Sequence, residues 1–105
     1  MIARLWHGIT TASKADEYLE FLNKTGVADY QATEGNLGVQ LLRRIEGDQA
    51  HFLIITFWES VEAIQRFAGQ DYEKARYYPE DQDFLIEFEE TVVHYEVMLS
   101  TPNQL

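Results

Sequence analysis

The chain of 105 residues is 46% hydrophobic and 13% aromatic, which suits one globular domain with a modest core. Eighteen acidic residues against eight basic ones give a net charge of −10, which repels nucleic-acid backbones and anionic membranes. Because the sequence has no cysteine, disulfides, thiolate nucleophiles and Cys-metal sites are excluded. We therefore expect a single domain over residues 1–105 that binds neither nucleic acid nor membranes. The sequence shows no signal-peptide pattern and no membrane-spanning run, so we expect a cytoplasmic location.

The first part of the chain predicts a strand, a helix and a second strand. Residues 2–8 form the first strand, with side chains that alternate between its two faces. Ser13 offers an N-cap hydroxyl to the helix that follows, and Gly26 is expected to end that helix. The pattern over residues 27–34 assigns no element, and residues 39–46 alternate as the second strand.

The segment 51–59, HFLIITFWE, is the most informative in the chain, and the turn Gly47-Asp48 joins it to the second strand as a hairpin. Its residues from Phe52 to Trp58 are almost all apolar, whereas a strand with one solvated face alternates. The few helices of so short a chain can cover one face of a sheet. We expect a second copy of the chain to cover the other face, which predicts a homodimer.

The last part of the chain predicts two helices and a final strand. Ser60 caps a helix that Gly69 ends, and a short helix is expected over residues 72–78, before a proline. The last strand is expected over residues 88–99, and Pro102 lies in a frayed tail. The order β-α-β-β-α-β predicts an α+β, ferredoxin-like fold, with an antiparallel sheet and helices on one face. The first and third strands are central in that fold.

Three segments of the sequence resemble the antibiotic biosynthesis monooxygenase superfamily: LWHGIT at the start, AHFLIITFWES followed by EAIQRFAG, and ARYYPED with VVHYEV near the end. The resemblance implies a dimeric α+β barrel, with a pocket in each subunit between the sheet and the helices. Members include cofactor-free monooxygenases of aromatic quinols and heme-degrading oxygenases, and others have no known activity. The fold alone does not decide among these activities.

The resemblance also bears on the site residues. Heme-degrading members use an Asn, a Trp and a His at the positions that hold His7, Phe67 and Tyr77 here, so the resemblance argues against heme degradation by their route. Quinol-oxidising members use a Trp, Tyr, Asn and Arg constellation, for which Trp58 lies in a matching local motif. Arg44 is a possible counterpart of the arginine in that constellation.

Two residues are candidates for catalysis. A cofactor-free oxygenase needs a base near neutrality and a donor for the developing charge in a dry aromatic pocket. His7 is the candidate base and Tyr77 the candidate donor, and both are expected to reach the pocket that Trp58 lines. The alternative for His7 is a solvated histidine at a strand end, and His51 is expected to be exposed.

The candidate substrate-binding residues are aromatic or cationic: Trp58, Phe67, Arg76, Tyr78 and His94. Trp58 and Phe67 could instead fill the core, and His94 could be a cross-strand structural partner. Arg76 could hold a phenolate or carboxylate, or could form an ion pair with Glu73, Glu80 or Asp81.

Acidic residues dominate residues 79–90, but their spacing does not match a metal-binding loop. We therefore interpret that segment as a solvated rim and expect neither a metal nor a cofactor. The leading hypothesis is a homodimeric monooxygenase that oxidises a small planar aromatic or quinol-like molecule. The alternative is a non-catalytic dimeric module that binds or senses a small ligand. An RNA-binding module is excluded because the third strand lacks a basic aromatic motif and the net charge opposes it.

Overall fold

A computed structural model describes residues 1–101 of the chain. The elements in chain order are β1 (Ile2–Thr11), the 3-10 helix η1 (Ala12–Lys14), α1 (Ala15–Lys24), α2 (Gly26–Ala32), β2 (Asn36–Glu46), β3 (Gln49–Trp58), α3 (Val61–Ala68), the 3-10 helix η2 (Pro79–Asp83), β4 (Leu85–Glu87) and β5 (Val93–Glu96). None of the helices in this described part is long and apolar enough to cross a membrane.

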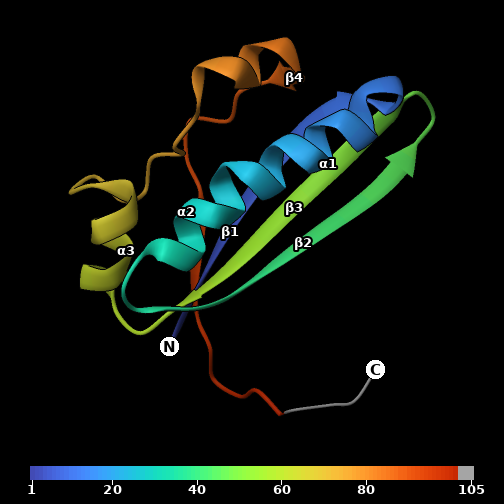
Figure 1. Cartoon of the computed structure of the whole chain (residues 1–105). Helices are drawn as coiled ribbons and strands as arrows, with labels where there is room; N and C mark the ends of the chain where they lie inside the picture. The colour runs from blue at the N-terminus through green and yellow to red at the C-terminus, as the bar shows by residue number, and fades with distance from the viewer. Residues whose placement is uncertain (102–105) are drawn as a thin grey trace.

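The strands form one antiparallel sheet in the order β2-β3-β1-β4, and β5 also pairs with β1. The predicted ferredoxin-like α+β fold, with β1 and β3 at the centre, is confirmed. Helices α1 and α2 lie lengthwise along one side of the sheet (Figure 1), and side chains from all three α-helices pack with those of β1 and β3 in one hydrophobic core.

The β3 strand alternates in burial although its sequence does not alternate in polarity. Phe52, Ile54 and Trp58 are buried under the helices, whereas Leu53, Ile55 and their neighbour Phe57 are only half-buried on the opposite face of the sheet. We call that opposite surface the helix-free face. No helix of residues 1–101 covers this apolar face.

Two predicted elements near the C-terminus are wrong, and the two errors have one cause. Residues 72–78 form a turn and an irregular segment instead of a helix, and the strand expected over residues 88–99 is present only as the short β5, with the separate short strand β4 before it. Between β4 and β5 the chain leaves β1 and pairs with the 72–78 segment, where Lys74 bridges to Thr91 and the amide of Val92 donates to the carbonyl of Glu73. Each segment therefore satisfies the backbone groups of the other.

The helix boundaries test the capping signals. Ser60 accepts a hydrogen bond from the amide of Ala63, and Gly69 ends α3 with φ of +88°, so both signals are confirmed. Ser13 does not cap α1, and Gly26 begins α2 rather than ending the helical region. The segment without an assignment, residues 27–34, is thus largely helical. Pro102 lies outside the described residues.

Gly8 leaves room for the indole of Trp6, two residues before it on the same face of β1. A Cβ atom at Gly8 would lie 2.3 Å from the Trp6 ring. The sheet therefore requires glycine here for close packing, and this requirement fixes the position of Trp6 under the helices.

We predict that Gly8→Ala lowers the free energy of unfolding by about 1–3 kcal/mol, because the added methyl group overpacks the buried indole. Gly38→Ala on β2 is the matched control, since its Cβ would lie 3.9 Å from its nearest neighbour, Phe57. Urea denaturation at one protein concentration measures both variants. Equal losses of stability in the two variants would contradict this account of Gly8.

Candidate functional site

A polar and aromatic cavity lies between the sheet and the helices, where the resemblance implied a pocket. Its volume is about 20 Å³, which is room for about one water molecule. Its lining comes from β1, α1, α2, β3, α3 and the segment 76–81: Arg4, Trp6, Tyr18, Leu22, Gly26, Tyr30, Ile54, Phe67, Arg76, Tyr78 and Asp81. We call this cavity the inner pocket.

Arg4 brings a positive charge to the inner pocket from the central strand, and only 2% of it is exposed. Its Nη2 donates to the carbonyl of Lys74 at 3.1 Å, and its guanidinium lies 5.5 Å from the centre of the Phe67 ring. Its Nε is buried without a hydrogen-bond partner, and residues 1–101 place no carboxylate within ion-pair distance of it. Burial lowers the pKa of this guanidinium, and the adjacent Tyr30 hydroxyl partly offsets that effect.

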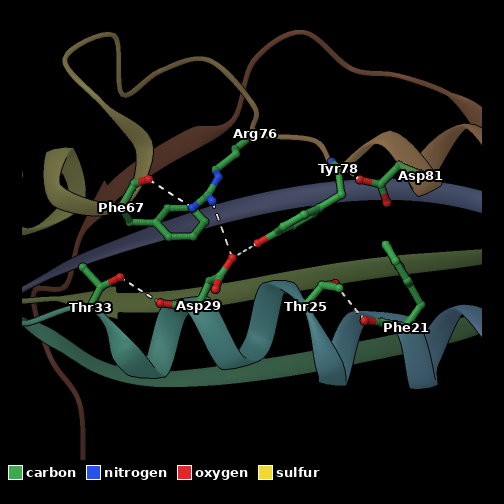
Figure 2. A network of polar contacts seen from close by, with 8 residues as sticks. All are labelled: Phe21, Thr25, Asp29, Thr33, Phe67, Arg76, Tyr78 and Asp81. Atoms are coloured by element: carbon green, nitrogen blue, oxygen red, sulfur yellow. Dashed lines mark hydrogen bonds and ion pairs between the residues drawn. The ribbon is translucent and has the colours of Figure 1, made fainter.

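Arg76 and Tyr78 close the inner pocket from outside by meeting one carboxylate on α2. The Tyr78 hydroxyl donates to Asp29, and Nη2 of Arg76 lies 3.5 Å from the same Asp29 oxygen (Figure 2). Nη1 of Arg76 donates to the carbonyl of Phe67 at 3.3 Å. We call this group of contacts the Asp29 latch. Arg76 thus pairs with Asp29, and not with Glu73, Glu80 or Asp81 as the alternative expectation had it.

Asp81 is the one carboxylate of the described residues that lines the inner pocket, and it is 3% exposed. Its Oδ1 accepts from the Tyr18 hydroxyl at 2.9 Å, and its Oδ2 accepts from the amide of Tyr78 at 2.7 Å. Burial raises the pKa of this carboxyl, although the two donors act in the opposite direction. The interpretation of the whole segment 79–90 as a solvated rim is therefore wrong at Asp81.

Trp58 supports the inner pocket without lining it. The side chain is fully buried, and its Nε1 donates to the Thr56 hydroxyl at 2.8 Å. Its ring packs 5.9 Å from that of Phe67, which in turn lies 4.5 Å from the ring of Tyr30. Phe67 does line the pocket, so one of the two candidate aromatic residues faces it directly.

His7 lies on the helix-free face, not in the inner pocket. Its Nδ1 is 2.7 Å from the Glu89 carboxylate, and its Nε2 is 3.1 Å from Nδ1 of His51. His7 and His51 line a separate hollow of about 350 Å³ with side chains of β2 and β3, which we call the outer hollow. His51 is accordingly a half-buried partner of His7 rather than a free surface residue.

Tyr77 lies in a third location, at the edge of the sheet. Its hydroxyl donates to the carbonyl of Glu89 at 2.6 Å and accepts from the indole N–H of Trp6 at 3.4 Å. It lines a hollow of about 510 Å³ that neither His7 nor Trp58 reaches. The expectation that these three residues line one pocket is therefore wrong.

His94 lies directly opposite Arg4, on the paired strand β5. Its ring packs edge-on against Tyr72 at 5.2 Å, and its Nε2 is buried without a partner among the described residues. Burial lowers the pKa of this imidazole, and the charge of Arg4 lowers it further. His94 lines a shallow hollow of about 140 Å³ beside α3, away from the inner pocket.

Four of the polar residues that line the inner pocket were not expected there from the sequence: Arg4, Tyr18, Tyr30 and Asp81. A signal for Arg4 was present, because Arg4 and Trp6 are two positions apart on a central strand and must share a face. A signal for Asp81 was also present. Pro79 after Tyr78 indicates the start of a short helical turn, and an aspartate three residues after Tyr78 can accept a hydrogen bond from the Tyr78 amide. Within residues 1–101 no group of three or more His, Cys, Asp or Glu side chains could hold a metal ion.

The fold and the inner pocket define a small α+β protein that has a polar, aromatic site between its sheet and its helices. The model of the antibiotic biosynthesis monooxygenase family matches residues 9–76, well over half of the sequence. The chain belongs to this family.

Solved structures share the fold. The heme-degrader MhuD from Mycobacterium tuberculosis, solved with two hemes bound in its active site, is 24% identical over 97% of this chain and 100% of its own, with a TM-score of 0.64. A proposed antibiotic biosynthesis monooxygenase from Bacillus cereus is 14% identical over 97% of both chains, with a TM-score of 0.67. A NIPSNAP domain protein from Burkholderia xenovorans is 15% identical over 98% of this chain and 100% of its own, with a TM-score of 0.58. No curated protein matches the sequence.

We predict that Tyr78→Phe lowers the free energy of unfolding by about 1 kcal/mol, because it removes the hydroxyl that donates to Asp29. Tyr72→Phe is the control, since the hydroxyl of this tyrosine makes no side-chain hydrogen bond among residues 1–101. Denaturant titration compares the two variants with the parent protein. An unchanged stability for Tyr78→Phe would show that the Asp29 latch does not hold the segment in solution.

Proposed function

We propose that this protein oxidises a small planar aromatic or quinol-like molecule with oxygen, without a cofactor, in the inner pocket. The observation that carries the proposal is Asp81, a buried carboxylate with a raised pKa among phenol and indole side chains. A carboxylate with a raised pKa is a stronger general base than an ordinary surface aspartate. Asp81 takes the role that the sequence analysis gave to His7.

The proposed reaction is illustrated by an anthrone, in which a ring CH₂ group becomes a carbonyl. Asp81 takes one proton from this carbon, and the carbanion passes one electron to O₂. The resulting radical and superoxide join in a C–O bond, and the peroxide takes up the proton that Asp81 holds. Loss of water then breaks the O–O bond and leaves the carbonyl, so that substrate and O₂ give product and water. The protein needs to supply only a base, a dry site and orientation.

The proposed substrate contacts are Phe67, Arg76 and Tyr78, which were expected from the sequence and line the inner pocket. The pocket is smaller than a planar ring system, so entry of substrate requires the segment 72–78 to move away. That segment is neither helix nor strand, and Arg76 and Tyr78 tie it to α2 through the Asp29 latch. We propose that opening of the latch admits the substrate. Tyr77 would move with the same segment, whereas Trp58 on β3 would stay packed against the Phe67 ring.

A non-catalytic binding module is the second candidate function. The observation in its favour is that both oxygens of Asp81 already accept hydrogen bonds, from Tyr18 and from the amide of Tyr78. A carboxylate engaged in this way orders the segment around it and is a weaker base. In that case the pocket would bind the same class of planar molecule and release it unchanged.

Heme degradation of the kind named for MhuD is not proposed for this chain. In the described part of the molecule no histidine lines the inner pocket, and Phe67 packs between Tyr30 and Trp58. Tyr77, at the position expected for an axial ligand, is engaged with Glu89 and Trp6. A phenolate ligand would also favour ferric iron and resist the reduction that oxygen activation needs.

We also propose that the chain is a homodimer joined through the helix-free face. This face exposes apolar side chains from four strands, which a soluble monomer rarely leaves in contact with water. They include Leu42, Val93 and Tyr95, which are 43%, 52% and 60% exposed, and the half-buried Leu53 and Ile55.

We predict that Asp81→Asn lowers the rate of oxygen uptake on an accepted anthrone or hydroquinone by about 10²-fold or more. Because Asp81 must be ionised to accept a proton, turnover in the parent should rise with pH through its pKa, which lies above the ordinary carboxyl value. An oxygen electrode measures uptake against a substrate panel with no cofactor added. His7→Ala is the competing variant: if it stops turnover and Asp81→Asn does not, the chemistry lies in the outer hollow.

We predict that Leu53→Lys converts the dimer into a monomer, because it places a charge at the centre of the helix-free face. Leu19→Lys on α1 is the control, since Leu19 is 38% exposed on the helical side of the molecule. Light scattering coupled to size-exclusion chromatography gives the mass of each. A parent protein that is monomeric at micromolar concentration would exclude the dimer.

A further inference from the structure

Arg4 is a buried cation for which the described residues supply no counter-charge. It is 2% exposed, its Nε has no hydrogen-bond partner, and it lines the inner pocket. A buried charge without a partner is strongly unfavourable unless something else neutralises it. We propose that Arg4 binds the anionic group of the ligand, which is a planar aromatic carboxylate or ionised phenol.

The surroundings of Arg4 do not provide a structural reason for its charge. Lys74 offers one backbone carbonyl, and Tyr30 offers a hydroxyl whose pKa burial raises, so that this phenol stays neutral. A methionine of similar length could fill the same space without burying a charge. His94, its cross-strand partner, also carries a buried nitrogen without a hydrogen-bond partner, so two unsatisfied polar atoms come from paired positions of β1 and β5. Natural proteins keep few such atoms, and those that persist call for an explanation by function.

The second guanidinium of the pocket does not take over this role. Arg76 lies 4.8 Å from the centre of the Phe67 ring, on which Arg4 also lies at 5.5 Å. While the latch is closed, Asp29 neutralises Arg76, whereas residues 1–101 place no carboxylate within ion-pair distance of Arg4. When the latch opens, Arg76 moves away with the segment 72–78, so Arg4 on the central strand is the cation that the described residues keep at the base of the pocket.

The aromatic walls decide which anion is suitable. Trp6, Tyr30 and Phe67 line the pocket around Arg4, and their faces favour a flat ring system over a compact, strongly hydrated ion such as phosphate. A guanidinium can hold both oxygens of a carboxylate at once, and it can also stabilise a phenolate. The ligand class is therefore an aromatic ring with a negative charge at the end that reaches β1.

This inference rests on the proposed function in one respect, the use of the inner pocket for a planar molecule, and it holds for an enzyme and for a binding module alike. The test is therefore a binding measurement without turnover. The probes are 2-naphthoate and its uncharged methyl ester, which share one ring system. Quenching of the tryptophan fluorescence of Trp6 and Trp58 gives the Kd of each probe for the full-length chain.

In the parent protein we expect 2-naphthoate to bind at least 10-fold more tightly than the ester. Arg4→Met should remove this preference while the ester still binds, and should leave the melting temperature unchanged or raise it, since it removes an unpaired buried charge. Arg44→Met, which removes an exposed cation of β2, should keep the preference. If Arg4→Met does not fold, Arg4→Lys replaces it, and loss of the two-pronged contact should weaken naphthoate binding at least 3-fold with the ester unaffected.

Three results would overturn the proposal: equal affinity of the parent for both probes, no binding of either probe, or a full preference retained in the Arg4 variants. A lower melting temperature of Arg4→Met together with equal weakening of both probes would also overturn it, because that pattern indicates a structural arginine. Failure of the proposed reaction is a different result, namely charge-selective binding with no oxygen uptake.

Discussion

The rest of the structure depends on the strand β1 and on its strict alternation between two faces. β1 pairs with β3, β4 and β5, so it has almost no freedom to shift register without breaking the sheet. The alternation sends Arg4 and Trp6 under the helices, and it sends Leu5 and His7 to the helix-free face. One strand thus supplies the cation of the inner pocket and the histidine of the outer hollow, on opposite sides of the sheet.

The sequence predicted those parts of the fold that depend on local pattern. The order of strands and helices up to Gly69, the hairpin before β3 and the cap at Ser60 all follow from spacing and turn chemistry, and each is confirmed. The segment after Gly69 was not predictable in the same way. Its conformation depends on pairing with residues near Thr91, and such long-range pairing leaves no periodic signal in either segment.

The candidate site was predicted in part, and the failures have specific physical reasons. Phe67, Arg76 and Tyr78 line the inner pocket as expected, because an amphipathic helix and a polar-aromatic cluster both mark a surface that meets the core. His7 was expected in the pocket, but residues that are adjacent on a strand point to opposite faces, and Trp6, the residue before His7, already occupies the face under the helices. Asp81 was missed because burial of one carboxylate in an acidic run depends on tertiary contacts with Tyr18.

The inner pocket holds a cation and a carboxylate that do not neutralise each other. Residues 1–101 form no ion pair between Arg4 and Asp81, and each has its own tyrosine neighbour, Tyr30 beside Arg4 and Tyr18 bonded to Asp81. A direct ion pair between the two would have been the more stable arrangement, and it would have left the pocket without a free charge of either sign. Keeping them apart reduces the stability of the fold, and it leaves one group to hold an anion and another to accept a proton. Such a separation of buried opposite charges is expected where the function of the site, rather than the stability of the fold, determines which residues line it.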